Sequence, residues 1–415
     1  MFKGSKKLTA LILVVFVAVF FGFSVNAMAE EENVVRVGAI YPLSGESAAN
    51  GEAQRRAHDF AVEKINEQGG IESLGGAKIE MIYADSESRP ELGTSEAERL
   101  ITEEDVHVIM GTFESHVGVA IQDVTERYNV PLIIANALAD EFVERDAEHT
   151  YKTVINTTDL GRDTAAFVRD MSDELDADIS EVAILYGDFF FGHEVARGWQ
   201  ETLPEYGFDI VADIAYPVPA TDLSDAILSV RRNDPDIVFT LGNITEATLL
   251  LETMRSYNYW PNYAVVGVGG GFTEDTFFQN VGDMAEGLFV TNDWFPNIDM
   301  PGAQEINQEY RERYGVDMIG NANTTYASMW VLVDALERAA SLEHEDISRA
   351  LAETDIGNEG PTAFMYEGVA FDETGMNIYA RNAVAQVQDG ELNVVWPLEQ
   401  QFSDPVFPVP HWNER

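Results

Sequence analysis

Short apolar runs alternate with amphipathic helical patterns along most of the chain. Their alternating order is typical of parallel strands that helices cover on both sides, and the first runs are largely apolar. They lie at residues 34–41, 78–85 and 106–111, with helices predicted after them at 54–66, 92–101 and 118–128. A fourth run, at 130–136, leads into a loop. The pattern predicts an α/β fold with right-handed crossovers.

A second series of the same kind occupies the middle of the chain. Its apolar runs lie at 182–188, 208–216, 236–242 and 263–269, with helices predicted between them at 192–203, 223–232 and 246–256. A chain of 415 residues is too long for one ordinary hydrophobic core. The two series therefore predict two lobes of similar build.

The last third of the chain departs from this regular alternation. The run "GLFVTNDW" at 287–294 is followed by helical patterns at 303–314 and 326–340. A final segment, 378–397, contains "QDGEL", which predicts the turn of a β-hairpin. The pattern alone does not show to which lobe each of these elements belongs.

The first residues have the composition of a secretory signal peptide. Lys3, Lys6 and Lys7 precede an apolar run at 8–23, and "AMA" ends at Ala29, which predicts cleavage after residues 1–29. A retained membrane anchor is the alternative, because the run is close to the length that spans a bilayer. With no Cys in the chain, neither a lipid-anchored Cys nor a disulfide is available. We expect a soluble protein exported to the periplasm.

The charge balance is extremely acidic, with a formal net charge of −47. Residues 1–29 hold three Lys and no acid, so their removal would change it to −50. Such a surface repels itself in dilute buffer, and about 1 M salt shortens the Debye length to roughly 3 Å. We therefore expect a halophilic acidic surface. Nucleic acid is excluded as a partner by this charge, and no calcium-binding loop motif is present.

Small and hydroxyl-bearing residues follow the strands of the first series, where open α/β sheets bind ligands. The free N–H groups at a helix start favour an anion, and Ser115 immediately precedes a predicted helix. An N-cap that serves only the fold is the alternative for Ser115. The candidate ligand-binding residues of this half are Ser44, Asn50, Phe113, Ser115, Asn136, Ala137 and Ala139.

The second series offers aromatic and backbone groups instead. "YGDFFFGHE" places Phe189, Phe190 and Phe191 before a helix, and Phe191 is the strongest candidate to face a ligand. Asn243 ends another strand, and Gly269 offers only backbone. No nucleophile elbow, zinc-binding His pair or phosphate-binding loop occurs, so neither catalysis nor a metal or other cofactor is predicted.

Together these segments make the chain resemble the periplasmic solute-binding proteins of branched-chain amino acid (Leu/Ile/Val-type) ABC transporters. The resemblance covers nearly all of residues 34–400 and rests on "VGAIYPLSG", "IMGTFESHVGVAIQDVTERYNVPLI", "LYGDFFFGHE", "LSDAILSVRRNDPDIVFTLG" and "GDMAEGLFVT". It implies the type I periplasmic binding protein fold, two Rossmann-like lobes joined by three hinge crossings near 155–160, 286–292 and 357–368. Lobe 1 would then comprise 30–157 and 290–360, and lobe 2 would comprise 158–289 and 361–415.

The resemblance also implies roles for individual residues. Ser115 and the following exit loop would hold the carboxylate of the ligand, although Ala139 stands where a hydroxyl is usual. Phe191 would close on the ligand from lobe 2, and Asn243 replaces a frequent Tyr. Gly269 stands where an acid usually pairs with the ligand's ammonium.

The missing acid leaves two hypotheses, because an unpaired buried ammonium costs several kcal/mol. Either Glu114 or Glu246 pairs with the ammonium in place of the missing acid, or the ligand has no ammonium. The hypothesis of a ligand without an ammonium is preferred.

The sequence thus predicts the solute-binding subunit of an ABC importer. It would capture an amino acid, or an amino-acid-like keto or aromatic acid, as a monomer, and deliver it to a membrane permease with separate ATPase subunits. The alternatives are a ligand-binding sensor module and a protein that binds a neutral amide or urea-type solute. An exported hydrolase is disfavoured by the absence of catalytic motifs.

Overall fold

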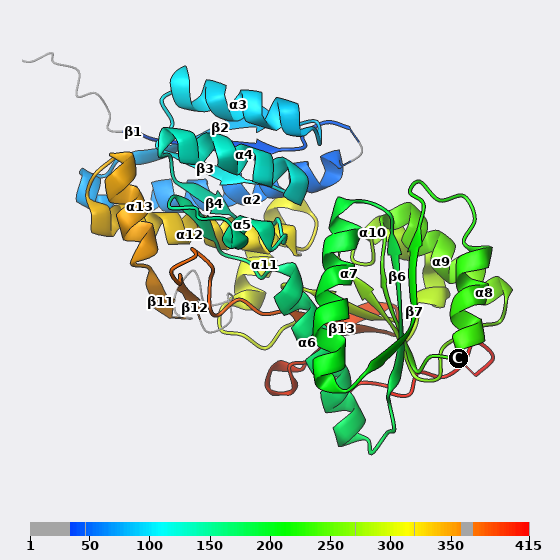
Figure 1. Cartoon of the computed structure of the whole chain (residues 1–415). Helices are drawn as coiled ribbons and strands as arrows, with labels where there is room; N and C mark the ends of the chain where they lie inside the picture. The colour runs from blue at the N-terminus through cyan, green and yellow to red at the C-terminus, as the bar shows by residue number, and fades with distance from the viewer. Residues whose placement is uncertain (1–33, 46, 270, 319, 358–367, 415) are drawn as a thin grey trace, which may run out of the picture.

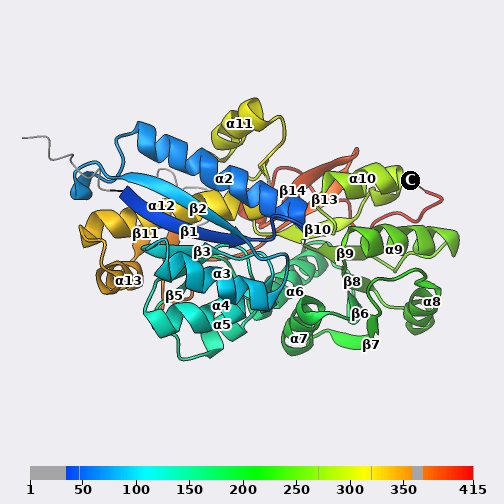
Figure 2. The ribbon, with the colours of Figure 1, turned by 90° about the horizontal axis from the view of Figure 1, so that it is seen from above.

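The computed structural model describes residues 34–45, 47–269, 271–318, 320–357 and 368–414. The expected signal peptide, 1–29, lies outside these residues. Two α/β lobes are joined side by side (Figures 1 and 2), and each is built around its own sheet. As expected, their strands come mainly from the two successive series of apolar runs.

The sheet of the first lobe has five parallel strands in the order β2-β1-β3-β4-β5. Their bounds are β1 (Val34–Tyr41), β2 (Lys78–Asp85), β3 (Val108–Gly111), β4 (Leu132–Ile134) and β5 (Thr150–Lys152). The sequence pattern did not predict β5, which has only three residues. A strand this short cannot show a periodicity of its own.

Helices cover both faces of this sheet. One face carries α2 (Ala48–Glu67) and α12 (Asn321–Ala339), which pack together, and the other carries α3 (Pro90–Thr102) and α4 (Ser115–Tyr128). β1 is buried on both faces: Val35 and Val37 belong to the same core cluster as Phe60 of α2, whereas Ile40 belongs to the cluster of α3 and α4. The shorter helices are α5 (Glu141–Glu144), α11 (Ala303–Tyr314) and α13 (His344–Ala352).

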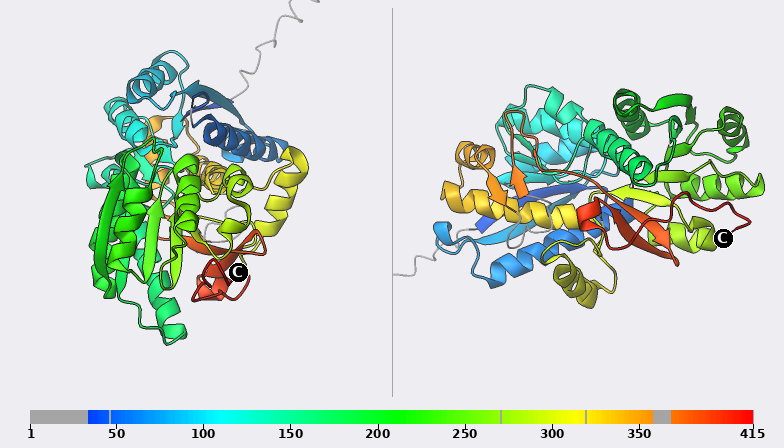
Figure 3. Two further views of the ribbon diagram at one scale, coloured as in Figure 1. Left: turned by 90° about the vertical axis from the view of Figure 1, so that its right-hand side faces the viewer. Right: turned by 90° about the horizontal axis from the view of Figure 1, so that it is seen from below.

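The sheet of the second lobe has seven strands in the order β14-β13-β10-β9-β8-β6-β7. β6 to β10 are parallel to their neighbours within that group, and the C-terminal hairpin is added antiparallel to β10 (Figure 3). The bounds are β6 (Glu181–Gly187), β7 (Asp209–Tyr216), β8 (Ile237–Leu241), β9 (Ala264–Val268), β10 (Phe289–Asn292), β13 (Ala383–Gln388) and β14 (Glu391–Trp396).

The helices of the second lobe include one that the sequence pattern did not predict, α6 (Thr157–Glu174). It packs closely against α7 (Phe190–Thr202) through Gly161 and Gly198. A Cβ on Gly198 would lie 2.3 Å from the carbonyl oxygen of Thr157, so only glycine permits this approach. The remaining helices are α8 (Ser224–Asn233), α9 (Ile244–Ser256) and α10 (Asp275–Val281).

The expectation that the run at 287–294 belongs to lobe 1 is wrong for β10. Phe289–Asn292 pairs with β9 on one side and β13 on the other, so it belongs to the second sheet rather than to lobe 1. The second crossing therefore begins after β10, and not within 286–292. Strand order in a sheet is a tertiary property, and the local pattern of this run carried no signal for it.

The third crossing is also displaced from its expected position. Most of the range 357–368 lies outside the described residues, and β12 (Gly368–Ala370) pairs with β11 (Asp355–Gly357) beside the first lobe. Phe371 contacts the ring of Tyr151 in β5, so the chain has not yet left that lobe. It crosses over at about 378–382, before β13.

The first and third crossings are joined by hydrogen bonds. The backbone N–H of Asn377 donates to the carbonyl of Lys152 at 3.0 Å, and its amide donates to the carbonyl of Thr153 at 3.0 Å. On the other lobe, the N–H of Asn382 donates to the carboxylate of Asp163 in α6 at 2.8 Å. Two segments far apart in the sequence thus share one hinge.

In the described part of the chain, every helix is too short or too polar to cross a membrane.

Candidate functional site

The interlobe loops are the segments that follow β1, β3 and β4 in the first lobe and β6, β8, β9 and β10 in the second. The loop after β1 is organised by Asp85, at the end of β2. One oxygen of this carboxylate accepts the N–H groups of Leu43 at 2.8 Å, Ser44 at 3.3 Å and Glu87 at 2.9 Å. Desolvation by itself would raise the pKa of Asp85, but the hydrogen bonds from Ser44, Glu87 and Leu43 together outweigh it and lower the pKa. Ser44 itself is exposed.

Ser115 joins the loops after β3 and β4. Its side chain is buried, and its hydroxyl oxygen accepts the N–H of Ala139 at 3.3 Å. Ser115 is the first residue of α4, Glu114 occupies the N-cap position, and neither side chain caps the helix. The alternative that Ser115 is an N-cap is therefore wrong. It holds the two loops together at the start of a helix, where free N–H groups favour an anion.

Glu114 turns its side chain toward the end of β2. One carboxylate oxygen accepts the hydroxyl of Ser88 at 2.6 Å. The other oxygen is buried and has no hydrogen-bond partner among the described residues. Within its own lobe, only one of the two carboxylate oxygens of Glu114 therefore has a hydrogen-bond partner.

Asn136 is engaged by the first lobe itself. Its amide nitrogen donates to the carbonyl of Asn321 at 2.9 Å and to the hydroxyl of Thr324 at 2.8 Å, and its oxygen accepts the hydroxyl of Thr325 at 3.2 Å. These partners belong to the first turns of α12. The structure therefore gives Asn136 the role of fixing the loop after β4 to that helix.

The other first-lobe candidates lie close to the same sheet edge. Ala137 and Ala139 are fully buried, Phe113 is half-buried, and Asn50 lies in the first turn of α2. The small side chains of the loop after β4 allow it to pack against the start of α4. The structure thus brings four candidates together, Phe113, Ser115, Ala137 and Ala139, with Ser44 and Asn50 at the neighbouring β1 exit.

In the second lobe, Phe190 rather than Phe191 makes the ring contact with the first lobe. Phe190 is exposed, and its ring centroid lies 6.1 Å from that of His116 in α4. Phe191 is half-buried and packs against the main hydrophobic cluster. Adjacent residues of a helix point about 100° apart, and the run of three Phe gave no signal of which one faces outward.

Asn243 and Gly269 lie at the ends of β8 and β9. Asn243 is exposed at the N-cap position of α9, where its side chain makes no capping hydrogen bond. Gly269 has a φ of +71° and nothing within 4 Å of a built Cβ, so open space lies in front of it. Glu246, a suggested replacement acid, is buried and accepts the N–H of Ala220 at 3.0 Å. Its carboxylate serves the loop after β7.

A charged contact that the sequence did not indicate joins the lobes beside these loops. Arg197 of α7 donates to Asp140 at 3.0 Å and to Glu144 at 3.2 Å, both in the first lobe. Asp140 also accepts the hydroxyls of Thr157 at 2.6 Å and Thr158 at 3.0 Å, at the start of α6. Asp140 thus links the loop after β4 to two helices of the second lobe. With 72 acids in the chain, sequence alone could not single it out.

The hinge also contains a buried lysine and a buried acid. Lys152 ends β5, and its ammonium donates to the carbonyls of Val154 and Ile155. Burial lowers the pKa of Lys152 to about 7, against the opposing effect of Asp140, Asp293 and Asp159. Burial likewise raises the pKa of Asp293, which follows β10, to about 6, and Lys152 opposes this rise. Both charges lie where the two lobes meet.

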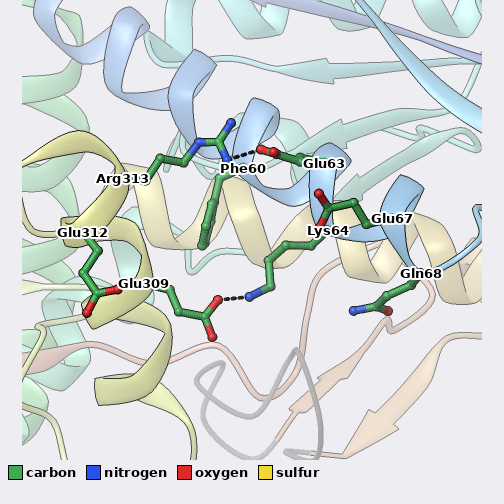
Figure 4. A pocket seen from close by; sticks show the side chains of 8 residues that line it. All are labelled: Phe60, Glu63, Lys64, Glu67, Gln68, Glu309, Glu312 and Arg313. Carbon is green, nitrogen blue, oxygen red and sulfur yellow. Dashed lines mark hydrogen bonds and ion pairs between the residues drawn. The ribbon is translucent and has the colours of Figure 1, made fainter.

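A cavity of about 610 Å³ lies away from the interlobe loops, between α2 and α11 (Figure 4). Its walls carry the ion pairs Lys64–Glu309 and Glu63–Arg313. The rest of its lining consists of Phe60, Glu67, Gln68 and Glu312, and no strand end reaches it. Within the described residues, no group of three or more His, Asp or Glu side chains is placed to hold a metal ion.

The comparison with known families identifies this architecture. The model of the family described as "Periplasmic binding protein" matches residues 34–391. The chain belongs to the periplasmic binding protein family. The resemblance and the fold expected from the sequence are both confirmed.

Individual relatives place the chain near the Leu/Ile/Val-type members. The Leu/Ile/Val-binding protein homolog 7 of Brucella suis is 30% identical over 382 residues, which cover 89% of this chain and 93% of that protein. A branched-chain amino acid transporter substrate-binding protein of Streptococcus pneumoniae, solved in complex with isoleucine, has the same fold. It is 22% identical, with a TM-score of 0.74, over 86% of this chain and 97% of that one.

A second solved structure shares the fold at lower identity. It is an ABC transporter solute-binding protein of Rhodopseudomonas palustris in complex with benzoate. It is 18% identical, with a TM-score of 0.73, over 90% of this chain and 97% of that one.

Proposed function

We propose that this protein is the extracytoplasmic substrate-binding subunit of an ABC importer, and that it binds a small carboxylate-bearing solute between its lobes. The observation that carries the proposal is the Ser115–Ala139 contact at the start of α4. It gathers a hydroxyl and the free N–H groups of a helix at the carboxyl edge of the first sheet. These donors suit a carboxylate.

The second lobe supplies the opposite wall in this proposal. The ring of Phe190 lies against His116, the residue after Ser115, so an aromatic side chain of the second lobe lies close to the proposed anion site. An amino acid, or an amino-acid-like keto or aromatic acid, combines one carboxylate with an apolar group. The ligands bound in the two solved structures, isoleucine and benzoate, have this chemistry.

Binding would drive closure of the lobes. The solute docks on the first lobe and then contacts the second, and it shifts the population toward the closed form by its greater affinity for that form. A membrane permease would accept the solute from the closed form, with ATP hydrolysed by separate subunits. In this proposal the solute is released chemically unchanged, because the protein holds it by non-covalent contacts only.

Isothermal titration calorimetry with a panel of carboxylates tests the proposal. The panel contains the protein amino acids, their 2-oxo acids and benzoate, with leucinamide and urea as matched compounds that lack a carboxylate. We expect at least one carboxylate to bind and to decrease the radius of gyration in small-angle scattering. Binding of leucinamide or urea alone, or no binding at all, would contradict the proposal.

A further inference from the structure

One face of α7 contacts the first lobe at two points. Phe190 begins this helix and Arg197 follows seven residues later, which is about two turns, so both side chains lie on the same face. The ring of Phe190 lies 6.1 Å from that of His116 in α4. The guanidinium of Arg197 donates to Asp140 at 3.0 Å and to Glu144 at 3.2 Å. A single helix of the second lobe thus docks on the first.

Both points of contact directly follow the proposed carboxylate site in the sequence. His116 is the residue after Ser115, and Asp140 is the residue after Ala139. Ser115 accepts the N–H of Ala139, so the two loops that α7 touches are the two that this hydrogen bond joins. The docking of α7 is therefore coupled to the loops of the site.

The guanidinium of Arg197 is surrounded by acids of both lobes. Asp140 and Glu144 belong to the first lobe, whereas Glu194 belongs to α7 itself and accepts from the same guanidinium at 3.0 Å. Burial raises the pKa of Glu194, and the two acids of the first lobe raise it further, whereas Arg197 lowers it. Without the guanidinium, carboxylates of the two lobes would face one another at close range.

The contact is partly shielded from water. The side chain of Asp140 is 6% exposed, and that of Arg197 is 35% exposed. Asp140 also accepts the hydroxyls of Thr157 and Thr158 at the hinge, but these donors are neutral and leave its charge in place. A buried carboxylate that loses its cationic partner destabilises the contact that buries it.

The neighbouring cations are engaged elsewhere. Asp140 raises the pKa of Lys152, so the two lie within electrostatic range, but the Lys152 ammonium donates to carbonyls of its own crossing. Arg145 pairs with two acids inside the first lobe. Arg197 is therefore the cation that joins acids of the two lobes at this contact.

We infer that Arg197 is a positioning residue that neutralises the facing acids, so that α7 can dock beside the Ser115–Ala139 contact and hold the lobes together around a solute. The inference rests on the proposed function for the solute and goes beyond it by assigning the charge that permits closure. In a chain with a net charge of −47, closure brings like charges together, and a single guanidinium at the contact counts for that reason.

Arg197→Met removes the charge and keeps much of the length of the side chain. Relative to the wild type, we expect it to weaken binding of the tightest carboxylate of the panel by about 10-fold in 0.15 M sodium chloride. The loss should shrink to less than about 3-fold in 1 M, because the Debye length falls from about 8 Å to about 3 Å. Calorimetry measures both, at temperatures at which circular dichroism shows every variant to be folded. A loss of equal size at both salt concentrations would overturn the inference.

Three further variants make the test specific to charge. Arg197→Lys should stay within about 3-fold of the wild type. Arg197→Met combined with Glu194→Gln, which removes the facing acid of the second lobe, should recover most of the lost affinity. Arg145→Met is the matched control, because Arg145 is also 35% exposed but pairs inside one lobe, and it should leave affinity unchanged. An unrecovered loss in the double variant would contradict the inference.

Glu194→Gln by itself keeps the test decisive if Arg197→Met does not fold. It leaves the guanidinium to the acids of the first lobe, so we expect binding to tighten by about 3-fold in 0.15 M salt and to stay unchanged in 1 M. No gain in 0.15 M salt would then overturn the inference.

A measurement without solute separates the inference from the proposed function. Because the chain has no Cys, Ser95→Cys on α3 and Asp225→Cys on α8 place two spin labels at exposed sites of the two lobes. By double electron–electron resonance in 0.15 M salt, Arg197→Met should shift the ligand-free population toward longer interlobe distances, and 1 M salt should reverse the shift.

The outcomes are distinct. If no carboxylate binds the wild-type protein, the proposed function fails and the interlobe distances alone decide the inference, which an unshifted distribution in Arg197→Met would overturn. If a carboxylate binds the wild type and Arg197→Met equally well in 0.15 M salt, the inference fails and carboxylate capture stands.

Discussion

At the scale of single residues, the hydroxyl of Ser115 can serve both as a hydrogen-bond acceptor and as a hydrogen-bond donor. Its oxygen accepts the N–H of Ala139, and no described residue accepts its hydrogen. A hydroxyl can accept and donate at the same time. The same group can therefore shape the loop after β4 and donate to a bound carboxylate.

Ser115→Ala should weaken carboxylate binding by about 1–3 kcal/mol, because a buried charged group would lose a hydrogen bond. Calorimetry with the tightest ligand of the panel measures this. Ser172→Ala is the matched control, since Ser172 is also buried but donates to the carbonyl of Ala177 at the far end of α6. Unchanged affinity in Ser115→Ala would leave Ser115 with the loop contact alone.

At the scale of elements, the hinge is the region where sequence patterns and structure differ most. The sequence pattern did not predict α6, β10 belongs to the second lobe instead of the first, and the third crossing lies later in the chain than expected. Most strands and helices of the two series nevertheless occur where their patterns place them. The reason is physical. Regular elements follow from local periodicity, whereas a crossing is defined by which sheet each end joins.

The start of α6 contains a buried acid whose ionisation should affect stability. Burial raises the pKa of Asp163 from an ordinary 3.8 to about 7, against the N–H of Asn382 and the nearby Arg381 and Arg162, while Asp159 adds to the rise. The folded state therefore favours the protonated acid. Its contribution to stability is fully present below about pH 4 and is lost as the pH rises through about 7.

Asp163→Asn keeps an oxygen to accept the N–H of Asn382 but cannot ionise. We expect its free energy of unfolding to exceed that of the wild type by an amount that grows between pH 4 and pH 8, up to about 4 kcal/mol. Urea unfolding at several pH values measures this. Asp178→Asn, at an exposed site beyond α6, should show a difference that does not vary with pH. A parallel pH course for both variants would contradict the assignment of a raised pKa.

At the scale of the whole molecule, the surface charge is the dominant electrostatic feature. The formal net charge of −47 on the chain opposes both folding and closure in dilute buffer. Salt bridges on the surface offset little of this, because exposed pairs contribute at most about 1 kcal/mol each.

We expect the melting temperature to rise steeply between 0.1 and 2 M sodium chloride, because screening shortens the range of the repulsion to about 3 Å at 1 M. Differential scanning calorimetry measures it. Potassium chloride should act similarly, whereas sucrose at equal osmolality, which does not screen charge, should stabilise less. A melting temperature that is indifferent to salt would remove the halophilic interpretation.

The sequence by itself determined the two α/β series, the acidic charge and the strand ends proposed to bind the ligand, because periodicity, charge and the order of elements are local properties. It also indicated Ser115 and the small residues of the next loop. Only the tertiary structure decided that Asn136 is engaged by α12, that Phe190 reaches His116, and that Asp140 links the loop after β4 to α6 and α7. These relations join segments far apart in the chain, and only strand register and helix packing bring them together.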